Sequence, residues 1–263
     1  MKLLRSPDIT WRFIRVWGRD VTVYRKTWAV NFMTPLLEPL FYLLAFSLGL
    51  GALIEKVPFE GDNLSYVVFI TPALLAVAVM YNAFFENTFA SFVRMYYQKT
   101  FDAILATPLS LDEIVTGEIA WGATKSVVAA VIVLGVVSAF GLVHYPHALL
   151  TLPVAFLGGI AFGSIGMFFT GIIPSIEMFN LPVFLFITPM FLFSGTFFPI
   201  DGLPHWVRQF AAVLPLTHLV DLTRHLCLGM LPARLLWNVA YLVAFCLIFY
   251  PLALAAMHRR LVH

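Results

Sequence analysis

The chain has 263 residues, of which 61% are apolar and 11% are charged. A soluble domain carries about 25% charged residues, so 16 basic and 14 acidic side chains cannot cover a soluble protein of this length. This composition excludes a soluble enzyme, a nucleic-acid-binding protein and a disordered chain, and it predicts an integral membrane protein. The two cysteines, Cys227 and Cys246, match neither a disulfide framework nor a metal-binding pattern.

The first segment, residues 7–28, alternates basic and apolar residues at helical spacing. Its charges interrupt the apolar run that a signal peptide would need. We therefore predict an amphipathic helix lying in the membrane interface, with Asp20 as the one residue that does not fit the pattern. Such a helix can be only a topological anchor, or it can also offer a surface to a cytoplasmic partner. Its candidate residues are Arg12, Arg15, Trp17 and Arg19.

Six stretches are long and apolar enough to cross a bilayer as helices, at about 31–54, 64–86, 119–143, 148–172, 177–198 and 235–257. The fold class is therefore an all-α integral membrane protein, with 1–263 forming a single domain. Twelve of the 16 Lys and Arg residues then lie on the side of the two termini. Because short cytoplasmic loops carry an excess of basic residues, both termini are predicted to be cytoplasmic.

The loop between the second and third spans, residues 95–107, predicts a short helix. Thr107-Pro108 should end this helix, because the residue before a proline avoids helical backbone angles. Ser110 and Glu113 then match a capping box, which begins the next helix. A short cytoplasmic helix with apolar side chains can dock into another protein or lie flat on the membrane as a connector.

The outer segment, residues 199–233, contains two short helix-like pieces separated by prolines. Irregular backbone at membrane depth is tolerated only where protein or a water-filled cavity covers it. A re-entrant helical hairpin beside a translocation path fits this condition.

Three motifs resemble the membrane subunits, or permeases, of type-2 ABC exporters. The motifs are Phe193-Ser-Gly-Thr-Phe-Phe-Pro199, then Leu214-Pro-Leu-Thr-His218 followed by Asp221 and Arg224, and Gln98-Lys-Thr-Phe-Asp-Ala-Ile-Leu-Ala-Thr-Pro108. The last of these, with Gly117-Glu-Ile-Ala-Trp121, is most similar to the nodulation protein J branch, whose members export lipo-oligosaccharides. The resemblance covers about residues 28–257.

The resemblance implies a pair of six-span subunits, here a homodimer, above two separate ATPase subunits that hold ATP and Mg. It makes the cytoplasmic segment a coupling helix that contacts the ATPase, with candidate residues Lys99, Thr100, Phe101, Asp102, Ile104, Leu105, Thr107 and Pro108. The chain contains no Gly-Lys pair and so no P-loop. We therefore expect this chain to be neither an enzyme nor the holder of a cofactor.

Candidate pathway or gate residues lie in the first span and around the outer hairpin. They are Glu38, Phe193, Gly195, Phe197, Phe198 and Pro199. Glu38, between Pro35 and Pro39, could line the path, form a structural pair or relay protons. Glu86, Lys125 and Glu177 should lie near the cytoplasmic face, where snorkelling or ion pairing accounts for them.

Other readings stay open at this stage. His218, Asp221 and His225 share a helical face, which a metal could use but which an amphipathic helix needs in any case. The expected function is a permease of an ATP-driven exporter in a bacterial inner membrane. The expected substrate is an amphipathic lipo-oligosaccharide or glycolipid, with no nucleic acid involved. A drug-efflux permease of the same family and a proton-coupled secondary transporter are the alternatives.

Overall fold

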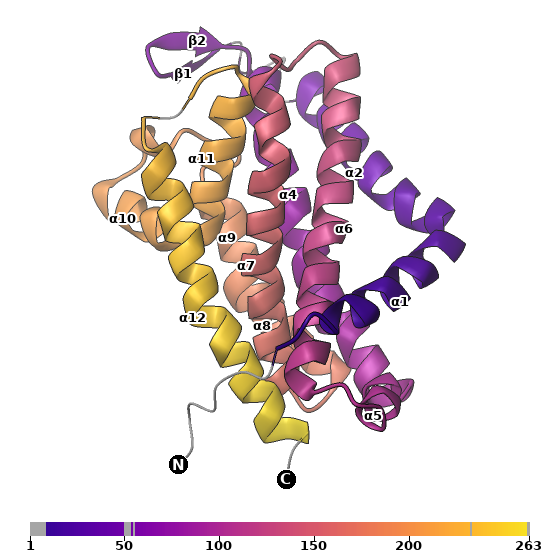
Figure 1. The fold of residues 1–263 in the computed structure, drawn as a ribbon. Coiled ribbons are helices and arrows are strands. Elements are labelled where there is room, and N and C mark those ends of the chain that lie inside the picture. Colours follow the sequence, from indigo (N-terminus) through magenta and orange to yellow (C-terminus); the bar gives the residue numbers. More distant parts are fainter. Residues whose placement is uncertain (1–8, 50–53, 55, 232, 262–263) are drawn as a thin grey trace.

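A computed structural model describes residues 9–49, 54, 56–231 and 233–261, and a bundle of long helices dominates it (Figure 1). The predicted helix start at residues 7–8 and the predicted end of the first span at 50–53 lie outside these residues. The C-terminal end of α12 (Leu235–Leu261) and the short helix α5 (Thr100–Leu105) lie at one end of the bundle. A two-stranded antiparallel hairpin lies at the other end.

The interface helix is α1 (Phe13–Lys26), and it is followed after one residue by α2 (Trp28–Leu48). At 21 residues, α2 has the length that a span needs. The side chain of Glu38, the pathway candidate in this helix, lies outside the part of the chain that the structure describes. The strands β1 (Val57–Phe59) and β2 (Asp62–Leu64) then form the hairpin. This hairpin was not predicted from the sequence, and its turn is made by Glu60 and Gly61, which have positive φ angles.

The second span is longer than expected, because α4 (Tyr66–Phe85) continues through two π-helical turns, Glu86–Ala90 and Val93–Tyr97. Residues 95–97 therefore belong to this helix and not to the coupling segment. The third span, α6 (Leu111–Ala139), begins before the predicted residue 119, at a Ser110–Glu113 capping box with both reciprocal hydrogen bonds. This early start includes the charged residues 112, 113 and 118, which the search for charge-free runs left out.

The fourth span consists of a 3-10 turn, His147–Leu150, and α7 (Thr151–Ile172). The fifth consists of short helical pieces from Ile176 to Phe193, including α8 (Asn180–Pro182) and α9 (Thr188–Phe193). The outer segment contains α10 (His205–Val213) and α11 (Pro215–Cys227). Within the described residues, five helices are long and apolar enough to cross a membrane: 66–97, 111–139, 147–172, 176–193 and 235–261.

Helix α7 packs closely against α4 and α6 through its glycines. A Cβ atom at Gly159 would lie 2.6 Å from the Cα atom of Ala123, and one at Gly166 would lie 2.9 Å from the carbonyl oxygen of Phe84. The small-residue stripe predicted from Gly159 and Gly163 therefore permits close contact between the backbones of these helices. Through these contacts α7 holds α4 and α6 close to itself.

Candidate functional site

A network of charged side chains joins α1, α4 and α6 at the end of the bundle that carries α5. Arg94 bridges two buried carboxylates, with its NH1 atom 2.8 Å from Glu86 Oε1 and its Nε atom 2.9 Å from Glu118 Oε2. Glu86 also accepts hydrogen bonds from Lys125 Nζ at 2.8 Å and from Trp121 Nε1 at 3.0 Å. Buried charges need partners, and this arrangement gives each carboxylate at least two donors.

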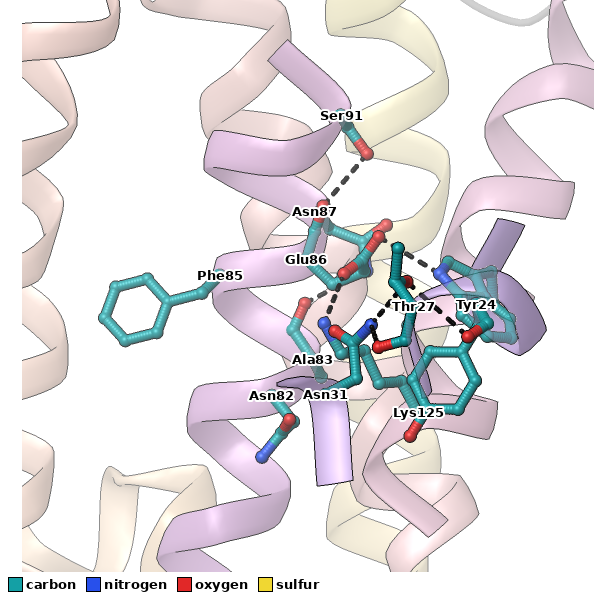
Figure 2. Close-up of polar contacts among 12 residues, drawn as sticks. Tyr24, Thr27, Asn31, Asn82, Ala83, Phe85, Glu86, Asn87, Ser91 and Lys125 are labelled. Atoms are coloured by element: carbon teal, nitrogen blue, oxygen red, sulfur yellow. Dashed lines mark hydrogen bonds and ion pairs between the residues drawn. The ribbon is translucent and has the colours of Figure 1, made fainter. Parts of the chain in front are cut away.

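Figure 2 shows Glu86 and Lys125 facing each other, with Thr27, which joins α1 to α2, and Asn31 of α2 close by. Ion pairing, one of the two alternatives for Glu86 and Lys125, is therefore present. Sequence reasoning missed Glu118 and Arg94 as members of this network. The available signal was charge inside otherwise apolar helices, since an ionisable residue within a span needs a partner.

Helix α1 is held to α6 by both polar and apolar contacts. Arg19 donates to Glu118 at 2.9 Å, and Trp17 Nε1 donates to Thr124 Oγ1 at 2.9 Å. Arg12 donates to the carbonyl oxygen of Pro108 at 2.9 Å. Arg15 is exposed. Three of the four predicted interface residues thus contact the third span or the loop before it.

Asp20, the residue that did not fit the amphipathic pattern, is buried beside this network. Burial and the nearby charge of Glu118 raise the pKa of Asp20 to about 6, although Arg94 and Arg19 act in the opposite direction. Asp20 therefore faces the protein and not the membrane surface. Its place in the sequence is explained by tertiary contact with α4 and α6.

The predicted coupling segment forms α5, but Phe101 is not the exposed apolar side chain that we expected. Its side chain is fully buried in a cluster with Val16, Phe92 and Leu111. Phe101 therefore anchors α5 to the bundle, and Ile104 and Leu105 are half-buried. The exposed residues in and around α5 are Tyr96, Tyr97, Gln98, Lys99, Asp102, Ala103, Ala106, Thr107 and Pro108.

A cavity of about 1010 Å³ opens beside the charged network. Its wall includes Asn31 and Tyr42 of α2, Tyr81 and Phe85 of α4, and Val183 of the fifth span, with the network side chains at one end. The cavity thus combines aromatic and charged surfaces. Such a lining suits a ligand with both polar and apolar parts.

The predicted gate residues lie at the opposite end of the bundle. Phe197 contacts Phe46 of α2 and Phe191 of α9, with ring centroids 5.5 and 4.9 Å apart, so it links the first and fifth spans. Phe193 contacts Phe210 of α10, and Phe198 is exposed. Gly195 has a φ of +74° and its carbonyl oxygen accepts a hydrogen bond from Arg224.

Arg224, quoted in the sequence motif without a role, is the buried residue that holds this region together. Its Nε atom donates to the carbonyl oxygen of Phe69, and its guanidinium carbon lies 3.9 Å from the centre of the Phe69 ring. The proposed metal set does not converge. Both ring nitrogens of His218 face oxygen atoms of Asn238 and Ala212, whereas His225 pairs with Asp221 and Glu60.

The fold and these features define an integral inner-membrane protein with a charged network at one end of its spans and a helical hairpin at the other. The family model described as "ABC-2 type transporter" matches residues 12–228. The chain belongs to this family, as the sequence motifs indicated, and so to the membrane-permease class of subunits.

Relatives match over nearly the whole chain. Nodulation protein J of Rhizobium leguminosarum bv. viciae is 35% identical over 98% of this chain and 97% of its own length. Nodulation protein J of R. leguminosarum bv. trifolii is 36% identical over 97% of this chain and 96% of its own. The inner membrane transport permease YadH of Escherichia coli is 21% identical, with 93% of each chain covered.

Proposed function

We propose that this chain is the permease subunit of an ATP-driven exporter, and that it moves an amphipathic lipo-oligosaccharide or glycolipid out across the bacterial inner membrane. The 1010 Å³ cavity between α2, α4 and the fifth span carries this proposal. It lies at the α5 end of the bundle, where a substrate would enter from the cytoplasm, and its aromatic wall and charged end match the two parts of such a substrate.

The proposed assembly contains two copies of this chain and two ATPase subunits, with α2 as the first of six spans and both termini cytoplasmic. Membership of the family and the names of its relatives support an exporter permease. The exposed surface around α5 is the proposed ATPase contact. ATP and Mg would be bound by the partner.

The contacts of α5 support a route for the movement. Phe101 is packed in one cluster with Phe92 of the second span and Leu111 of the third, so displacement of α5 displaces both spans. Arg94 and Glu118 join the same two helices. In this scheme closure of the ATPase pair moves α5, the two permease copies shift at their interface, and the aromatic contacts of Phe197 open.

Copurification with a co-expressed ABC ATPase subunit tests the partner. Asp102→Lys reverses a charge on the exposed α5 surface, and Asp62→Lys makes the same change on the hairpin at the opposite end. We expect the amount of copurifying ATPase to fall at least ten-fold with Asp102→Lys and to stay unchanged with Asp62→Lys. Equal recovery with both variants would contradict α5 as the contact.

Uptake of a fluorescent lipo-oligosaccharide into inverted membrane vesicles tests the transport. We expect uptake that requires ATP and continues in the presence of a protonophore. Uptake that a proton gradient drives without ATP would support a secondary transporter and refute the proposal.

A further inference from the structure

A second cavity, of about 640 Å³, lies at the hairpin end of the bundle between α10, α11 and the beginning of α12. Figure 1 shows the three helices α10, α11 and α12 whose residues line it. It is separate from the cavity lined by α2 and α4. Its volume is in the range of sites that hold small molecules.

The cavity combines hydrogen-bond donors and acceptors that the chain itself leaves free. In the described part of the chain, no hydrogen bond or ion pair engages the side chains of Arg208, Arg234 or Gln209, all of which are exposed. Asp201 adds a free carboxylate. These groups can therefore bind a ligand without breaking a contact within the described residues.

Ser194 supplies an independent observation that points to a ligand. Its side chain is fully buried and lines the cavity, and its Oγ atom has no hydrogen-bond partner among the described residues. Burial of a hydroxyl without a hydrogen-bond partner is unfavourable, so such a group is expected to find one. A polar ligand in the cavity would provide it.

Trp237 gives the cavity an aromatic surface at the first turn of α12. Its side chain is 65% exposed and lines the cavity together with both polar and apolar residues. The face of an indole ring packs well against the C–H surface of a flat polar molecule. The cavity thus offers an aromatic surface at Trp237, with Phe59 also in its lining, beside several polar side chains.

The mixture of charges narrows the class of ligand. Three carboxylates, Glu60, Asp201 and Asp221, line the cavity beside four cationic groups, Arg208, Arg224, Arg234 and His225, and His225 pairs with Glu60 and Asp221. With both signs of charge on its wall, the cavity has no field of a single sign that would select a phosphate or a simple cation. Uncharged hydroxyl groups both donate and accept hydrogen bonds, so they can use the two kinds of side chain together. We propose that this outer cavity is a binding site for neutral, hydroxyl-rich sugar units.

The identification of these sugars with the head group of an exported glycolipid rests on the proposed function. Phe210 and Val213 on α10 are exposed apolar side chains beside the cavity. An acyl chain could lie along this helix while the sugar occupies the cavity. The site would then hold the substrate as it leaves the translocation path.

Titration of the full-length permease in phosphatidylcholine nanodiscs, without its ATPase, tests the site. The probes are cellotetraose and chitotetraose, and the measurement is isothermal titration calorimetry. Trp237→Ala removes the aromatic platform. The matched control is Trp206→Ala, because Trp206 is 69% exposed on α10 and does not line the cavity.

We expect saturable binding of at least one tetrasaccharide, at least ten-fold weaker binding to Trp237→Ala, and unchanged binding to Trp206→Ala. A second variant, Arg208→Gln, should also weaken binding while leaving the unfolding temperature unchanged. Binding of neither sugar, or equal affinities in the two tryptophan variants, would overturn the proposal. So would Trp237-dependent binding of dihexanoyl-phosphatidylethanolamine in the absence of sugar binding, which would assign the cavity to a zwitterionic lipid.

This outcome is separable from that of the proposed function. Sugar binding is measured on the permease alone, whereas the ATPase contact is measured by copurification. A negative result for sugar binding therefore does not decide the ATPase contact, and a negative result for copurification does not decide the sugar site.

Discussion

Arg19 of α1 and Glu118 of α6 form an ion pair at 2.9 Å, although they are 99 residues apart in the sequence. The carboxylate of Glu118 is fully buried, and the side chain of Arg19 is 28% exposed. This pair connects the amphipathic helix α1 to the interior of the bundle. It places α1 directly on the network that also holds the second and third spans together.

Removing this pair should loosen α1 without unfolding the bundle. Because Glu118 keeps Arg94 as a partner and Arg19 is partly exposed, we expect Arg19→Ala to lower the free energy of unfolding by about 1–2 kcal/mol. Unfolding in mixed micelles with increasing SDS measures this change. The control is Arg15→Ala on the exposed side of the same helix, and an equal loss in both variants would contradict the assignment.

Arg94 should contribute more to stability than Arg19, because it serves two buried carboxylates. In Arg94→Met, Glu86 keeps Lys125 and Glu118 keeps Arg19. We therefore expect a loss near the lower end of the 3–5 kcal/mol that breaking a buried pair costs, about 3 kcal/mol. Lys99→Met, which removes an exposed cation, should change the unfolding free energy by less than about 0.5 kcal/mol. A wild-type value for Arg94→Met would show that the network does not stabilise the fold.

Phe101 and Asp102 are neighbours on α5 that should have different effects. Phe101→Ala creates a cavity in the cluster that anchors α5 and should cost about 3–5 kcal/mol in unfolding free energy. Asp102→Lys leaves that cluster intact and should change stability by less than about 1 kcal/mol. Unfolding curves of the two purified variants distinguish these outcomes. A stable Phe101→Ala variant would mean that the buried position of its ring is not important for the fold.

Gly195 occupies a backbone conformation that L residues rarely adopt, with φ of +74°. An added Cβ atom would also lie 2.7 Å from Cγ1 of Ile200. We expect Gly195→Ala to lower the free energy of unfolding by about 1–3 kcal/mol, as measured by SDS titration. Gly202→Ala is the control, because a Cβ atom there meets nothing within 4 Å. If both variants behave alike, the backbone of Gly195 is not constrained as described.

His225 should make stability depend on pH in the alkaline range. Burial alone would lower its pKa, but hydrogen bonds to Asp221, the charge of Asp221 and a contact with Glu60 raise it to about 9. Arg224 and the ring of Phe59 also lie near His225. Because the folded pKa exceeds the unfolded value of about 6.5, the stabilisation is full below pH 6.5 and is lost as the pH rises through 9.

The unfolding temperature of the wild type should therefore fall between pH 7 and pH 10. His225→Gln should be less stable at pH 6 and should show a flatter dependence over the same range. Parallel curves for the two proteins would show that His225 does not carry the proton that links pH to stability.

The sequence determined the class of protein because its evidence is local and additive. Apolar runs long enough for a bilayer, the bias of basic residues and the Ser110–Glu113 capping box depend on neighbouring residues, and the loop motifs were sufficient to indicate the family. The predicted start of the third span, residue 119, lies after the observed start of α6 at Leu111 for a related reason. In the sequence alone, the charge of Glu118 argues against a membrane span at this position, because its ion-pair partners are not known.

The tertiary structure decided which side chains face each other, and this depends on contacts between residues far apart in the chain. It brought Arg19, Arg94 and Glu118 together, turned Phe101 from a predicted contact residue into a buried anchor, and placed Asp20 inside the bundle. A buried charge is stable only with a suitably positioned partner. The position of that partner follows from helix packing, in which glycines such as Gly159 and Gly166 set the distance between the backbones.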